Sequence, residues 1–74
     1  MKITGKRSYI KVELDGKVVK IDGEMVVGGF VASKNSITYW EVPENNEIDE
    51  ETKKNIIEKV VQETKDSHLV ITFE

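Results

Sequence analysis

The sequence contains no cysteine and a single histidine, His68. Tetrahedral metal sites need several Cys or His ligands, and a Ser or Cys nucleophile needs a His as its base. One His and no Cys are too few for either kind of site. No three of the five glycines follow a strand and open a helix, as phosphate-binding loops require. The carboxylates lack EF-hand spacing and fall mostly in an apparent loop and helix start. We therefore predict no catalytic residue, no metal site and no cofactor, and we expect that the protein is not an enzyme.

No apolar run approaches the roughly 20 residues that a transmembrane helix needs. The basic stretch Met1–Arg7 is followed by no apolar segment and no cleavage pattern of a signal peptide. The lack of cysteine agrees with this, because small secreted domains usually rely on disulfides. We expect residues 1–74 to form one soluble, cytoplasmic domain with a thin core and no membrane contact.

Charge is unevenly placed along the chain, whose formal net charge is -3. Residues 1–40 hold seven Lys and Arg against four Asp and Glu, whereas residues 41–74 hold four against ten. This asymmetry favours an acidic face that steers a basic protein partner, and the acidic excess weighs against nucleic acid. The alternative is a solvated surface with uneven charge and no partner.

Residues 8–14 alternate between apolar and polar side chains, which indicates a half-buried strand. Asp15-Gly16 follows and then KVVKI, and Asp-Gly between two such runs predicts a two-residue hairpin turn. In the resulting register Leu14 lies opposite Lys17, Val12 opposite Val19, and Ile10 opposite Ile21.

A second Asp-Gly, Asp22-Gly23, predicts another hairpin into a strand over residues 24–27. Its register places Val18, Met25 and Val27 on one face, opposite Val12, Val19 and Val26. That face is a candidate binding surface or a second small core. Gly28-Gly29 then indicates a bulge or a sharp bend.

After this bend come the apolar residues Phe30-Val31-Ala32. The sequence then predicts a polar turn over residues 33–36 and a fourth strand over residues 37–42, which ends before Pro43. Asp49 with the acidic residues behind it predicts a helix start, and apolar residues at positions 56, 57, 60 and 61 give one amphipathic helix of about fifteen residues. Leu69, Ile71 and Phe73 alternate in a closing strand. The predicted fold class is α+β: an antiparallel meander of about five strands with one helix packed on one face and a C-terminal strand.

Tyr39 and Trp40 are adjacent, so on a strand they point to opposite faces and only one can belong to the core. The exposed one could anchor an interface or stack on a nucleic-acid base. The alternative is that it packs under the polar loop that follows. The sequence does not show which of the two is exposed.

Three stretches and a final strand ending in ITFE occur in a characteristic order, namely GEMVVGGF (23–30), SITYWEVP (36–43) and IDEETKKNIIEKV (48–60). In their order and spacing the chain, from about Ser8 to Glu74, resembles the small immunity proteins of bacterial polymorphic-toxin systems and is similar to the Immunity protein 74 family. The resemblance implies a protein that is made beside a toxin gene and neutralises that toxin, often a nuclease, by binding it in the cytoplasm. It supplies no contact residues.

Our leading hypothesis is a stoichiometric inhibitor that covers a basic surface of its cognate toxin with an acidic surface and an aromatic anchor. It acts as a monomer or a weak homodimer. The candidate contact residues are Tyr39, Trp40, Glu41, Glu44, Glu47, Asp49, Glu50 and Glu51.

Two alternatives belong to other classes. One is a small nucleic-acid-binding module, with an exposed aromatic residue and the basic residues Lys6, Arg7, Lys11, Lys17 and Lys20. The other is a self-associating structural domain that pairs through an edge strand or through the Val18, Met25 and Val27 surface.

Overall fold

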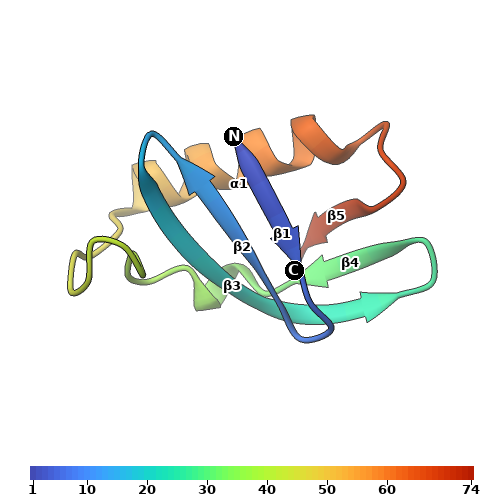
Figure 1. Cartoon of the computed structure of the whole chain (residues 1–74), viewed down its shortest axis with the longest axis horizontal. Helices are drawn as coiled ribbons and strands as arrows, with labels where there is room; N and C mark the ends of the chain where they lie inside the picture. Colours follow the sequence, from blue (N-terminus) through green and yellow to red (C-terminus); the bar gives the residue numbers. More distant parts are fainter.

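A computed structural model describes all residues, 1–74, and has an α+β fold: a curled five-stranded sheet with one α-helix (Figure 1). The strands lie in the sheet in chain order, with antiparallel neighbours throughout except for β4 and β5, which are parallel. The fold class is as predicted. The elements are β1 (Lys2–Gly5), β2 (Tyr9–Leu14), β3 (Lys17–Val26), β4 (Gly29–Ala32), the 3-10 helix η1 (Lys34–Ser36), α1 (Glu50–Thr64) and β5 (Val70–Phe73).

The first hairpin is confirmed in both its turn and its register. Asp15 and Gly16 have positive φ values of 49° and 80°, as a type I′ turn requires. Val12 pairs with Val19 and Ile10 with Ile21. All four side chains are fully buried, so the alternation in the sequence identified the core face correctly.

The second predicted hairpin is wrong, because Asp22-Gly23 lies inside the long strand β3. Asp22 pairs with Tyr9 on one side, and Gly23 pairs with Ala32 on the other. A Cβ at position 23 would lie 2.5 Å from the Phe30 ring and 2.3 Å from the Val31 carbonyl oxygen. Glycine is thus needed here for close packing and not for a turn.

The turn that follows β3 is at Val27-Gly28, where Gly28 has a φ of 80°. Because β3 continues without reversal, its even residues face away from the core and its odd residues face the core. Val18 and Met25 therefore lie on opposite faces, and the predicted common surface of Val18, Met25 and Val27 does not form. The N-terminal strand β1 was not predicted.

The predicted strand over residues 37–42 is also wrong. Ile37 and Trp40 are buried while Tyr39 is exposed, a three-residue spacing that is incompatible with strand alternation. The segment forms only two isolated bridges, one from Tyr39 to Glu47 and one from Val42 to Val18. It is the first limb of a loop that runs from residue 37 to residue 49.

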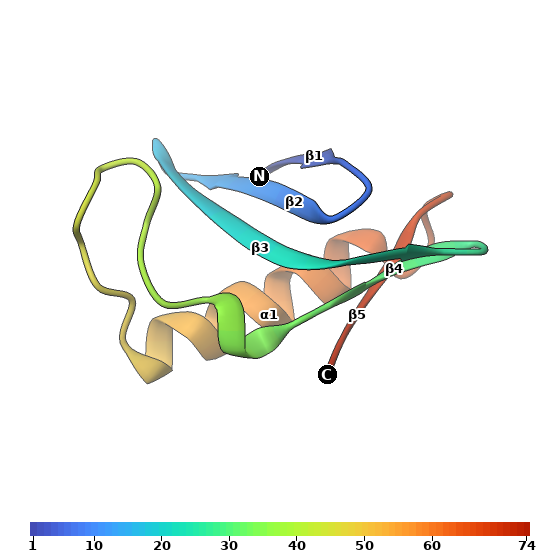
Figure 2. The same cartoon turned by 90° about the horizontal axis from the view of Figure 1, so that it is seen from below.

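The helix is confirmed, with Asp49 as its N-cap. Its core side presents Ile56, Val60 and Thr64, while Val61, expected in the same apolar stripe, is 39% exposed. The sheet curls around α1, as Figure 2 shows, and the helix packs against β5. The helix is neither long enough nor apolar enough to cross a membrane.

Candidate partner-binding surface

The loop of residues 37–49 folds back on itself through backbone hydrogen bonds. The Ile48 N–H donates to the Thr38 carbonyl at 2.8 Å, and the Trp40 N–H donates to the Asn46 carbonyl at 2.9 Å. Between these two bonds Tyr39 and Glu47 form an antiparallel bridge. The polar tip of the loop is therefore carried by a short ladder that fixes its direction.

The two aromatic residues of this loop have opposite environments, as predicted, although the strand on which that prediction rested does not form. Trp40 is only 8% exposed and belongs to the core, whereas Tyr39 is 56% exposed. The Lys17 ammonium lies 5.4 Å from the centre of the Trp40 ring and covers its outer side. Trp40 thus anchors the loop to the core, and Tyr39 is the aromatic side chain that remains accessible.

The loop is also fastened to the sheet. The Val18 N–H donates to the Val42 carbonyl at 2.8 Å, and the Glu41 N–H donates to the Val18 carbonyl at 2.7 Å. Lys11 on β2 forms an ion pair with Glu41, with 2.7 Å between Nζ and Oε1. This hydrogen bond, followed by the negative charge of Glu41, raises the pKa of Lys11 above its ordinary value of 10.5. Glu41 therefore fixes the loop more than it presents a free charge.

Asp49 ends the loop and caps the helix. Its carboxylate accepts a hydrogen bond from the Thr52 N–H at 2.7 Å, which lowers the pKa of Asp49 below its ordinary value of 3.8. Glu50 and Glu51 occupy the first turn, where negative charge is stabilised by the helix dipole. These three acidic positions are well explained by helix formation, and all three side chains are exposed.

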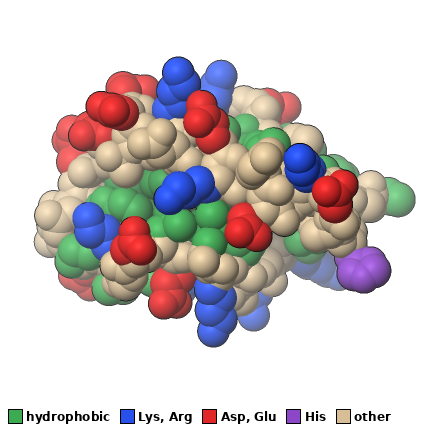
Figure 3. Space-filling model, turned by 90° about the horizontal axis from the view of Figure 1, so that it is seen from above, with side chains coloured by type: hydrophobic (Ala, Val, Ile, Leu, Met, Phe, Trp, Pro, Cys, Tyr) green, Lys and Arg blue, Asp and Glu red, His purple; other side chains and the backbone are tan.

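We call six of the eight predicted residues the acidic end: Tyr39, Glu44, Glu47, Asp49, Glu50 and Glu51. All are exposed and lie in the loop and the first turn of α1. Figure 3 shows Asp and Glu side chains gathered at the same end of the molecule as this loop in Figure 1. The remaining two predicted residues, Trp40 and Glu41, hold the loop in place.

The basic residues of the nucleic-acid alternative are largely engaged within the chain. Lys11 pairs with Glu41, Lys17 covers Trp40, and the Lys20 ammonium lies 4.6 Å from the centre of the Tyr9 ring. A phosphate backbone would have to compete with these contacts. Their geometry therefore favours a structural role for three of the five candidates.

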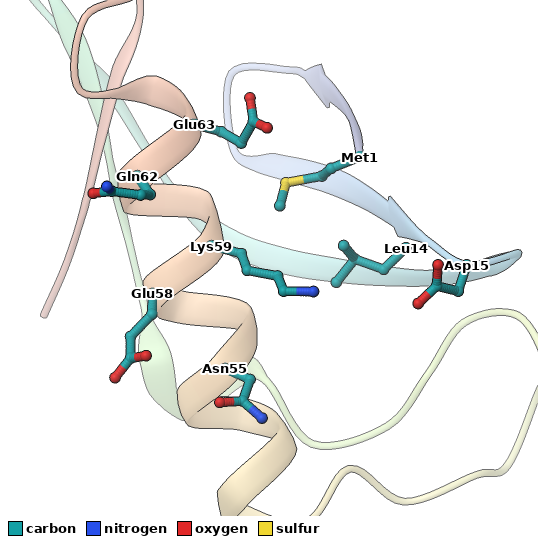
Figure 4. A pocket seen from close by; sticks show the side chains of 8 residues that line it. All are labelled: Met1, Leu14, Asp15, Asn55, Glu58, Lys59, Gln62 and Glu63. Atoms are coloured by element: carbon teal, nitrogen blue, oxygen red, sulfur yellow. The ribbon is translucent and has the colours of Figure 1, made fainter.

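A groove between α1 and the first two strands was missed by the sequence analysis. Its volume is about 720 Å³, and Met1 and Leu14 form its apolar side (Figure 4). The lining residues are far apart in the chain, so no local pattern connects them. The alternation of Met1 and Ile3 with Lys2 and Thr4 was the one signal that could have indicated a strand here.

Comparison with known proteins gives one clear result. No curated protein and no solved structure matches the chain. The family model for Immunity protein 74 matches residues 2–74, nearly the whole sequence. Immunity proteins bind cognate toxins and are typically non-catalytic inhibitors, in agreement with the prediction that this protein is not an enzyme. Because this match spans nearly the whole sequence, the chain belongs to the Immunity protein 74 family.

Proposed function

We propose that the protein neutralises one cognate toxin in the cytoplasm by binding it stoichiometrically and covering a basic surface with the acidic end. The observation that carries this proposal is the exposed Tyr39, which lies beside the exposed carboxylates of Glu47 and Glu50 on a loop that is fixed at both sides. Aromatic side chains held in one orientation are frequent anchors of protein interfaces. The carboxylates supply charge around that anchor.

The charge distribution supports a basic toxin surface as the target. Ten acidic residues against four basic ones in residues 41–74 create a negative field at this part of the chain. Such a field accelerates encounter with a positively charged partner and disfavours wrong partners. Nucleases present basic surfaces to their phosphate-rich substrates, and we therefore infer a nuclease as the class of toxin.

The first test is co-expression of the protein with the toxin encoded by the neighbouring gene. We expect protected cells and a complex that co-elutes in gel filtration. A toxin that remains fully active in cells and elutes separately would contradict the proposed function.

Charge reversal tests the surface itself. We expect the triple variant Glu44→Lys, Glu47→Lys and Glu50→Lys to lower the association rate by about tenfold at low ionic strength, because electrostatic steering is lost. The dependence of this rate on salt should become weaker. Stopped-flow kinetics at several salt concentrations measures both quantities.

A matched control makes the same charge change elsewhere. All three control residues are exposed and outside the loop: Glu24 lies on β3, Asp66 follows α1 and Glu74 follows β5. Their triple reversal to Lys should reduce the rate much less than reversal at the acidic end. Equal effects of the two triple variants would mean that only net charge matters and that the acidic end is not the contact.

A further inference from the structure

The outer backbone groups of the two edge strands, β5 and β1, have different hydrogen-bond partners. On β5, the Ile71 N–H donates to the Thr64 hydroxyl at 3.1 Å, so the end of α1 satisfies one outward backbone group of that edge. The Thr64 hydroxyl in turn donates to the Val60 carbonyl at 2.9 Å. On the opposite side, β1 pairs with β2 alone, and its other edge has no neighbouring strand. An unpaired strand edge is a template for another strand.

The direction of the free backbone groups follows from the ladder. The Lys6 N–H donates to the Tyr9 carbonyl at 2.9 Å, so Lys6 faces β2. In an antiparallel pair this direction alternates along the strand. The N–H and carbonyl groups of Ile3 and Gly5 therefore point away from β2, toward the open edge.

The groove runs beside this edge. Met1 is 46% exposed, and in Figure 4 Met1 and Leu14 face α1 while Lys59 extends from the helix toward Leu14. Polar residues of α1, Glu58 and Gln62 among them, also line the groove. At the other end of β1, the Leu69 side chain lies 3.6 Å from the point that a Cβ at position 5 would occupy. Leu69 therefore fills the space beside Gly5. Side chains of a strand added to β1 would enter the groove at its Met1 end.

The groove is continuous with the acidic end. Leu14, Asp15 and Lys59, which line the groove, also line a smaller hollow with Lys17 and Trp40. That hollow shares Lys17, Trp40 and Thr52 with a third one, which reaches the loop residues from Asn46 to Asp49. A partner seated on the acidic end thus has a path along α1 to the edge of β1.

We propose that an extended segment of the cognate toxin pairs with the free edge of β1 as a sixth strand. This inference rests on the proposed function. Alternation along that segment would place apolar side chains in the groove against Met1 and Leu14 and acidic side chains on the opposite face beside Lys2. Main-chain hydrogen bonds to Ile3 and Gly5 would supply affinity, and the alternating side chains would supply specificity.

The charge of the β1 edge favours a toxin segment with acidic residues over a second copy of the protein. Residues 1–7 contain Lys2, Lys6 and Arg7 and no carboxylate. Two β1 strands side by side would bring these positive charges together, and lysines at edge strands oppose such self-pairing. A segment with acidic residues is attracted instead.

Amide hydrogen exchange of the full chain, alone and saturated with the toxin, tests the proposal without any substitution. We expect the Ile3 and Gly5 amides to exchange at least about tenfold more slowly in the complex, with no change at Gly28 in the distant β3–β4 turn. A toxin that binds and leaves the Ile3 and Gly5 amides at their free rates overturns the inference while the proposed function stands. A toxin that does not bind contradicts the proposed function and this inference with it.

Ile3→Pro provides a second measurement, because it removes an outward N–H and leaves the bonds to β2 in place. We expect toxin affinity to fall about tenfold or more, the loss of one well-placed hydrogen bond. Ile3→Val, which keeps the N–H, should bind nearly as the original protein does. Equal affinities of the two variants would contradict strand addition, and so would a concentration-dependent dimer that Ile3→Pro abolishes, since a second copy would then occupy the edge.

Discussion

Gly23 is the residue at which the sheet leaves least room for a side chain. Its missing Cβ allows the Phe30 ring and the β4 backbone to approach β3 closely. Phe30 is 1% exposed and is among the largest fully buried side chains of the core. The close approach at a single glycine therefore supports the packing of a major core residue.

We expect Gly23→Ala to destabilise the protein by about 3 kcal/mol, because the new methyl group overlaps the Val31 carbonyl and cannot be accommodated by a side-chain rotation. Gly28 offers a matched comparison, since it has open space around it but a positive φ. Gly28→Ala should cost about 1 kcal/mol from backbone strain alone. Urea unfolding of the two variants measures the difference, and a Gly28→Ala cost equal to or larger than that of Gly23→Ala would contradict the packing role.

Asp49 gives the stability a defined pH dependence. Its folded-state pKa is lowered by the Thr52 hydrogen bonds, so its contribution is fully present above the unfolded-state pKa and is lost as the pH falls through the folded-state value. Asn at this position caps the helix but does not titrate. We expect the stability advantage of the original protein over Asp49→Asn to shrink as the pH falls below about 4, as measured by urea unfolding at several pH values. An advantage that grows on acidification would contradict this assignment.

At the scale of elements, local patterns predicted β2, the first hairpin and α1, because their turn, alternation and cap each act within a few residues. The second Asp-Gly has the same local signature as the first and was misread. The contact that decides its conformation is with Phe30, on the next strand. In the same way, residues 37–42 were misread because burial of Ile37 and Trp40 depends on the core beneath the loop.

The candidate site likewise has some features that the local sequence predicts and others that depend on distant parts of the chain. The acidic residues follow from composition. The opposite exposure of Tyr39 and Trp40 was expected from strand alternation, whereas in the structure it arises in a loop. The sequence could not show which of the two aromatic side chains is exposed, because that depends on which ring reaches the core. The β1 edge and its groove could not be predicted from one segment, since the strand and the helix that form them come from opposite ends of the sequence.

The junction of α1 and β5 depends on one hydroxyl group. Thr64 is 6% exposed and accepts the hydrogen bond of the Ile71 N–H. We expect Thr64→Val to destabilise the protein by about 1 to 3 kcal/mol, because it leaves a buried donor without a partner. The Ile71 amide should also exchange faster with solvent.

Thr64→Ser is the matched control, since it retains the hydroxyl and loses only a methyl group, at a cost of about 1 kcal/mol or less. Chemical unfolding and amide exchange of both variants provide the comparison. If Thr64→Val were as stable as Thr64→Ser and left Ile71 exchange unchanged, the hydroxyl would not be what joins α1 to β5.

At the scale of the whole molecule, the loop and the β3–β4 turn lie at opposite ends of the long axis, which extends 33 Å (Figure 1). The acidic end lies at one of them, and the groove leads from it along α1 to β1. Hollows that share residues therefore connect the acidic end with the groove beside β1. On the other edge strand, β5, α1 accepts a hydrogen bond from the Ile71 N–H.

Titration of the purified toxin with this protein tests the central claim most directly, namely that an Immunity protein 74 family member neutralises its toxin by stoichiometric binding. At toxin concentrations far above the dissociation constant, residual toxin activity should fall linearly and reach zero at one equivalent of the protein. Complete inactivation by a small fraction of an equivalent would indicate turnover and contradict a binding mechanism. Full toxin activity in the presence of a large excess would contradict neutralisation itself.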